Sequence, residues 1–148
     1  MITPDGRTAY VANGGSGTVT PISTRTNTAG PAIPVGPHAH AMAITPDGRT
    51  VYVTNDFSGT VTPISTRTNT AGPPIGVGRY PWTIAITPDG RTAYVVNLGS
   101  RTVTPISTRT NTAGPAIPVG IYPWTIAITP DGRTAYVVNA GNGLPRAR

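Results

Sequence analysis

A segment of 42 residues recurs along the sequence, and this period restricts the possible folds more than any other feature. The tripeptide Pro-Asp-Gly returns once per period, with its aspartates at Asp5, Asp47, Asp89 and Asp131. Between these marks, residues 17–36 return almost unchanged at 59–78 and again at 101–120. Copies this similar indicate one structural unit that is used repeatedly, and each unit needs its neighbours to cover an apolar face.

Each unit is predicted to form four short β-strands, which we call strands A, B, C and D in chain order. In the third copy they are expected at residues 83–87, 92–97, 102–107 and about 116–119. A Pro-Asp-Gly turn joins strands A and B, because proline presets the first turn angle and glycine accepts a left-handed backbone. Four strands in about forty residues are typical of a β-propeller blade, so the predicted fold class is all-β.

The sequence of strand B resembles a known repeat family. Residues 52–55 read YVTN, and the variants YVAN and YVVN begin at Tyr10, Tyr94 and Tyr136. With ITPDGRTAY before the motif and GTVTPIST after it, nearly the whole chain is similar to the YVTN family of β-propeller repeats. The resemblance implies a non-catalytic binding or scaffold module of a bacterial surface or envelope protein, and hence an extracytoplasmic location.

One departure from the resembled family is a proline within each strand C. Pro21, Pro63 and Pro105 interrupt this strand, where the family carries a Val-Ile-Asp-like sequence. A proline within a strand cannot donate a hydrogen bond to the neighbouring strand. We therefore expect a bulge or an early end to strand pairing at these three positions.

The number of repeats raises the question of how the propeller closes. The 148 residues make a single partial propeller of about 3.5 four-stranded antiparallel blades, with units at approximately 1–40, 41–82, 83–124 and, incomplete, 125–148. Propellers of the resembled family commonly close with seven blades, so apolar blade faces are expected to lie bare at both ends. Two explanations stay open: two chains self-associate to close one ring, or the chain is a fragment of a longer gene. The departure of residues 140–146 from the repeat favours the fragment.

The composition excludes several classes of protein. The chain has a formal net charge of +6 and no cysteine, so disulfides and thiolate metal sites are excluded. No apolar run reaches the ~18 residues that suggest a membrane span. Met1 is followed by Ile-Thr-Pro-Asp-Gly and not by a basic and then apolar stretch, so no export signal is expected.

Differences between the copies concentrate in loops that share one face of the predicted blades. Antiparallel alternation places the D–A and B–C loops on this face, and the A–B and C–D loops on the opposite one. The D–A and B–C loops hold aromatic and histidine side chains, which suit ligand binding. The candidate ligand-binding residues are His38, His40, Phe57, Arg79, Tyr80, Trp82, Tyr122 and Trp124. The alternative is that Trp82 and Trp124 only fill gaps between blades near the channel.

Arginines on the opposite face of the predicted blades suggest a different partner, a polyanion. Arginines follow the A–B turns and lie in the C–D turns, so this face could attract a polyanion such as nucleic acid. Each A–B arginine lies two residues from an aspartate that partly neutralises it. The face also lacks the interleaved aromatic side chains that single-strand binders use. Nucleic-acid binding is therefore not expected.

The sequence contains one pattern that resembles a metal site and no catalytic motif. His38 and His40 form a His-x-His pair with Asp56 in the adjoining loop, which is a donor set that can bind metal. The other copies hold tyrosine and tryptophan at the histidine positions, so we expect structural or surface roles and no metal or cofactor. There is no glutamate to pair with the aspartates and no Gly-x-Ser-x-Gly motif, so no catalytic residue is predicted. The alternative is a lactonase-like enzyme whose site needs further blades.

Overall fold

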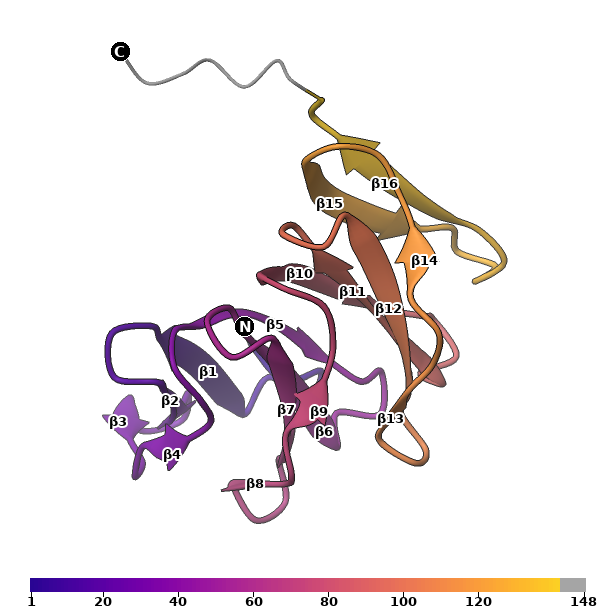
Figure 1. The fold of residues 1–148 in the computed structure, drawn as a ribbon. Coiled ribbons are helices and arrows are strands. Elements are labelled where there is room, and N and C mark those ends of the chain that lie inside the picture. The colour runs from indigo at the N-terminus through magenta and orange to yellow at the C-terminus, as the bar shows by residue number, and fades with distance from the viewer. Residues whose placement is uncertain (142–148) are drawn as a thin grey trace.

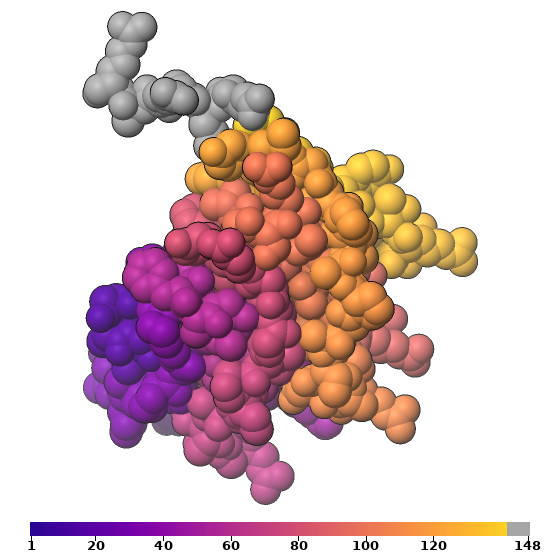
Figure 2. Space-filling view, in the orientation of Figure 1, coloured from indigo at the N-terminus to yellow at the C-terminus, as the bar shows by residue number. Residues whose placement is uncertain are grey.

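The computed structural model describes residues 1–141 and contains only β-strands and turns (Figure 1). Four antiparallel sheets follow one another in chain order, and Figure 2 shows the repeats as neighbouring bands. The all-β fold with antiparallel blades is thus as predicted. The strands are β1 Thr8–Asn13, β2 Thr18–Ser23, β3 Thr28–Ala29, β4 Ile33–Pro34, β5 Ala39–Ile44, β6 Thr50–Asn55, β7 Thr60–Ser65, β8 Thr70–Ala71, β9 Ile75–Gly76, β10 Pro81–Ile86, β11 Thr92–Asn97, β12 Thr102–Ser107, β13 Thr112–Ala113, β14 Ile117–Pro118, β15 Pro123–Ile128 and β16 Ala135–Asn139.

The second and third blades show the full topology. In the third blade, β10 pairs with β11, β11 with β12, and β12 with both β13 and β14. The predicted bounds of strands B and C are confirmed at both ends by β11 and β12. Strand A begins at Pro81, two residues earlier than predicted. Strand D, predicted at about 116–119, is present as β14, but the second short strand of this edge, β13, was not predicted.

The proline of strand C explains why two short strands, β13 and β14, pair with β12 in place of one longer strand. The ladder between β11 and β12 passes through Pro105 without interruption, because Tyr94 lies opposite this proline in regular register. The carbonyl of Pro105 accepts a hydrogen bond of 2.7 Å from the amide of Gly114 on the strand D side. The nitrogen and carbonyl of one strand residue face the same side, so the missing donor also faces strand D. The expected bulge is therefore absent from the B–C ladder, and pairing is interrupted on the C–D side.

The A–B turns have the same hydrogen bonds in every copy. In the second blade, the Thr45 hydroxyl donates to Asp47 at 2.6 Å and accepts from the amide of Thr50 at 3.1 Å. Asp47 also accepts from the amide of Arg49 at 3.0 Å. These bonds, that from the threonine first, hold the pKa of all four Pro-Asp-Gly aspartates below the ordinary value of 3.8. Gly48 accommodates the turn at a φ of 70°.

The apolar cores lie between successive blades. One core joins the first two blades around Tyr10 and Val51, and another joins the second and third around Tyr52 and Ile106. Each buried tyrosine of strand B reaches the following blade: Tyr52 donates 2.6 Å to Oδ1 of Asn111. Burial, together with the negative charge of Asp47, raises the pKa of Tyr52 to about 12.

The outer faces of the described region carry apolar groups. Tyr136 and Val138 on β16 are exposed, as are Ile2 and Val11 at the first blade. This agrees with the prediction of bare blade faces. The departure from the repeat at residues 140–146 lies mostly outside the described residues. No helix within residues 1–141 is long and apolar enough to cross a membrane.

Candidate functional site

The D–A and B–C loops meet on one face, where main-chain hydrogen bonds fix their shape. Each D–A loop accepts a bond from the B–C turn of the blade that it enters. The amide of Asp56 donates to the carbonyl of His38 at 3.2 Å, and Leu98 donates to Tyr80 at 2.9 Å. A matching bond of 2.9 Å joins Ala140 to Tyr122. The three D–A loops therefore have one backbone frame, which carries one set of side chains in the first loop and another in the second and third.

This frame holds uncommon backbone conformations. His38, Tyr80 and Tyr122 occupy equivalent positions and have φ values of 58°, 50° and 53°. Left-handed backbone is costly for such residues, and it often marks sites where side-chain placement matters. Just after Tyr80, the register between strands A and B breaks: Trp82 lies between Pro81 and Thr83, which are both paired with strand B. An extra strand residue of this kind turns its side chain out of the regular alternation.

A row of three rings crosses the inner strands at these breaks. The rings of His40 and Trp82 lie 4.1 Å apart between centroids, and those of Trp82 and Trp124 lie 5.1 Å apart. Nδ1 of His40 also donates 2.9 Å to the carbonyl of Trp82. Trp82 is thus enclosed on both sides by its counterparts, whereas Trp124 keeps 44% of its surface exposed. The row both packs neighbouring blades and presents an aromatic surface.

Next to this row, His38 and Asp56 form a close pair. Nδ1 of His38 lies 3.1 Å from Oδ2 of Asp56, whose side chain is only 5% exposed. Burial raises the pKa of Asp56, and the imidazoles of His40 and His38 partly oppose that shift. The His38 ring stacks at 4.5 Å on Phe57, which is 69% exposed. Oδ1 of Asp56 is buried and has no hydrogen-bond partner within residues 1–141.

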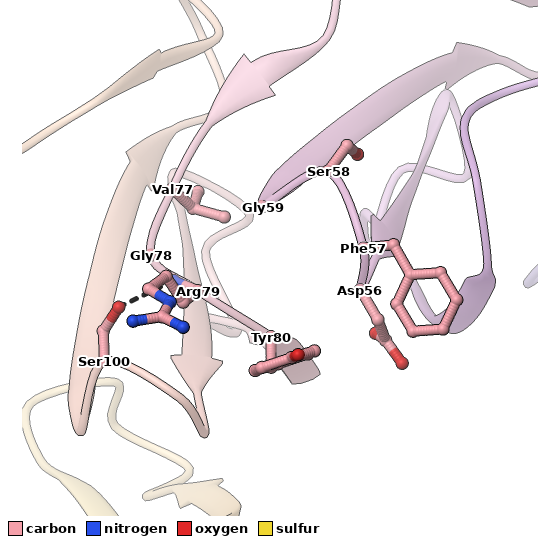
Figure 3. Close-up of a pocket in the computed structure, with 9 residues that line it drawn as sticks. All are labelled: Asp56, Phe57, Ser58, Gly59, Val77, Gly78, Arg79, Tyr80 and Ser100. Atoms are coloured by element: carbon pink, nitrogen blue, oxygen red, sulfur yellow. Dashed lines mark hydrogen bonds between the residues drawn. The ribbon is translucent and has the colours of Figure 1, made fainter.

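A cavity of about 530 Å³ opens between the second and third blades (Figure 3). The B–C turn of the second blade contributes Asp56 and Phe57, and the following D–A loop contributes Arg79 and Tyr80. Ser100, from the third blade, accepts 2.6 Å from the amide of Arg79 and so joins the two loops. The cavity combines aromatic surface with a carboxylate, a guanidinium and a hydroxyl.

The structure places the predicted binding residues in two groups, one at the cavity and one in the row of rings. Phe57, Arg79 and Tyr80 line the cavity, and His38 contacts it through Asp56. His40, Trp82 and Trp124 form the ring row, while Tyr122 repeats the position of Tyr80 one blade further along.

Six of the nine residues that line the cavity were not among the predicted binding residues: Asp56, Ser58, Gly59, Val77, Gly78 and Ser100. Asp56 and Ser100 both lie in B–C loops of the predicted face. Asp56 was weighed as a metal ligand and as an acid–base carboxylate, but neither residue was predicted to bind a ligand. The signal for Asp56 was available, because the other copies carry Gly14, Leu98 and Ala140 at its position. Ser100 matches Ser16 and Ser58, so nothing in the sequence distinguishes it.

The chemistry of other sites is limited. Among the described residues, no three histidine or acidic side chains converge as metal ligands would. The rings of His38 and His40 lie nearly parallel, 6.4 Å apart between centroids. On the opposite face, hollows of about 670 and 700 Å³ are lined by arginines, threonines and prolines, without an aromatic side chain.

Comparison with known proteins places the fold in the β-propeller class. No protein-family model matches the sequence, and no curated protein matches it either. Among solved structures, Kuenenia stuttgartiensis hydrazine synthase is 32% identical, with a TM-score of 0.90 over 97% of this chain and 42% of that one. A functionally unknown protein from Desulfotomaculum acetoxidans is 27% identical, with a TM-score of 0.82 over 94% and 47%.

A third match is a likeness of fold alone. A putative 6-phosphogluconolactonase from Bacteroides uniformis is 18% identical, with a TM-score of 0.80 over 94% of this chain and 46% of that one. The chain therefore spans less than half of each of these three structures. The likeness covers nearly every described blade, so the chain has the architecture of β-propeller-like proteins.

Proposed function

We propose that this chain is a non-catalytic, ligand-binding part of a YVTN-type β-propeller at a bacterial surface or envelope. The D–A and B–C loops form the ligand surface. The observation that carries the proposal is the uneven distribution of sequence differences. The A–B and C–D turns are nearly identical between copies, whereas the D–A and B–C loops differ and bring their aromatic side chains to one face.

The experiment compares exposed aromatic residues on and off this face. Trp124→Ala removes the open end of the ring row, and Tyr136→Ala removes an exposed aromatic ring from β16. The probes are purified peptidoglycan, dextran and heparin, each immobilised for binding measurements. We expect peptidoglycan or dextran to bind, Trp124→Ala to weaken that binding, and Tyr136→Ala to leave it unchanged. Absence of binding to every probe would refute the proposal.

Heparin distinguishes the polyanion alternative. If the arginine face binds the ligand, the protein is retained on immobilised heparin at low salt and released at high salt. Replacing Arg67 and Arg109 with Ala would then abolish retention, while Trp124→Ala would not. This pattern would replace the loop-face proposal.

A second candidate function, a lactonase-like hydrolase, is favoured by the His38–Asp56 pair. A buried carboxylate bonded to Nδ1 of an imidazole leaves Nε2 available as a general base. Nε2 would take a proton from water as its oxygen adds to the lactone carbonyl. The ring C–O bond would then break, and the proton would pass to the departing alkoxide. Hydrolysis of gluconolactone above the buffer rate, lost in His38→Gln, would support this candidate.

A further inference from the structure

We propose that the cavity between the second and third blades is a subsite for one uncharged sugar ring. Hydroxyl groups of the ring donate to the Asp56 carboxylate, and its C–H face lies on Tyr80. This inference rests on the proposed ligand-binding function and names the chemical class that the loop face takes.

The Asp56 carboxylate has unmet hydrogen-bonding capacity. An ionised carboxylate offers about four acceptor positions. His38 engages Oδ2 at 3.1 Å, while Oδ1 is buried and unpartnered among the described residues, and Asp56 is one of the residues that line the cavity. Buried polar atoms are nearly always paired in proteins, so an unpaired one calls for a donor. A ligand hydroxyl supplies that donor at low cost.

Charge balance selects a neutral ligand. The groups that face Asp56 are His38 and His40, and Arg79 lines the other side of the cavity. A cation would meet Arg79, and an anion would meet Asp56. A hydroxyl group both donates and accepts, so a sugar can bond to the carboxylate at one end and to the guanidinium at the other.

Tyr80 supplies a rigid platform for the flat face of the ring. Its backbone is fixed at a φ of 50°, and its carbonyl accepts from Leu98 at 2.9 Å. The tyrosine ring lies close over Gly99, where an added Cβ would come within 2.6 Å of Cδ2. Figure 3 shows Tyr80 across from Asp56 and Phe57, with the Phe57 ring pointing away from Tyr80. A side chain that is already held in place loses little entropy on binding.

The repeat provides an internal comparison. Tyr122 occupies the position of Tyr80 in the next copy, with the same 45% exposure and a φ of 53°. Leu98 stands there in place of Asp56. The junction between the third and fourth blades thus has the aromatic platform without the carboxylate, and it is not expected to bind a single sugar.

The test titrates the 148-residue chain with the methyl glycosides of glucose, galactose, mannose and N-acetylglucosamine. Binding is measured by NMR chemical-shift changes and calorimetry. The variants are Asp56→Asn and Tyr80→Asn, with Tyr122→Asn as the matched control, because asparagine tolerates left-handed backbone. We expect saturable binding of at least one glycoside. Asp56→Asn and Tyr80→Asn should each weaken it about tenfold or more, and Tyr122→Asn should leave it unchanged.

Several outcomes would overturn this inference. Glycosides that fail to bind, while dextran or peptidoglycan binding still depends on Trp124, would refute the sugar subsite and leave the proposed function intact. Binding that is equally weakened by Tyr122→Asn would also refute it. If tetramethylammonium or phosphate binds more tightly than every glycoside, and Asp56→Asn abolishes that binding, the cavity takes an ion. Circular dichroism of each variant establishes that the fold is retained, and Tyr80→Asn decides the matter if Asp56→Asn does not fold.

Discussion

Removing the hydroxyl of Tyr52 should measure how strongly one blade is held to the next. Tyr52 is 0% exposed, and its hydroxyl donates 2.6 Å to Asn111 in the C–D turn of the following blade. Tyr52→Phe keeps the ring and loses this bond. Because Asn111 is exposed, water replaces the lost donor, and the expected cost is about 1 kcal/mol of the free energy of unfolding. With a urea dependence of ~1–3 kcal/mol per molar, the unfolding midpoint should fall by about 0.3–1 M.

The assay is urea unfolding followed by the fluorescence of Trp82 and Trp124. Tyr136→Phe is the matched control, because Tyr136 is 65% exposed and its hydroxyl has no partner within residues 1–141. A double-mutant cycle with Asn111→Gly isolates the pair, since glycine accepts the φ of 54° at that position. Equal midpoint shifts for Tyr52→Phe and Tyr136→Phe, or a coupling energy near zero, would refute the reasoning.

Two further predictions follow from the turns and loops. Gly78→Ala should destabilise the protein by about 1–3 kcal/mol, because the added Cβ would lie 2.6 Å from Cγ of Asn97. Gly76→Ala, where nothing lies within 4 Å, is the control, and melting temperatures compare the two. The four Pro-Asp-Gly aspartates have pKa values below 3.8, so their contribution to stability is complete above that pH and is lost as pH falls through the lower folded values. Melting temperature should therefore drop with pH below about 3.8, and a flat profile there would contradict the assignment.

The repeat predicts strands B and C of each blade correctly, but not the start of strand A or the full outer edge of the blade. Strands B and C were placed correctly because identical copies and turn residues bound them on both sides. The start of strand A was missed because the register breaks at Trp82 and pairing resumes at Pro81, which the alternating sequence pattern does not predict. Strand D was predicted where β14 lies, whereas β13 was missed, because a strand of two residues is too short to show an alternating pattern.

The candidate site was predicted as a set of residues but not as a cavity. Variation among near-identical copies identified the loop face, and it also placed His38 near Asp56. The contact between Arg79 and Ser100 joins two loops of different turns, and only the folded backbone brings them together. The burial of Asp56 likewise depends on the packing of both loops, which its sequence neighbours do not specify.

The shared hydrogen bonds of the D–A loops have a consequence for how such a chain can change. The carbonyls of His38, Tyr80 and Tyr122 accept equivalent bonds, although residues 37–40 of the first loop differ in sequence from the other two loops. Main-chain atoms therefore specify the loop conformation, and side-chain identity is free to vary without refolding. Transplanting residues 37–40 into the corresponding segment of another copy should carry their chemistry to a new position around the axis. Gene duplication followed by mutation of these short segments would produce new specificities on an unaltered framework.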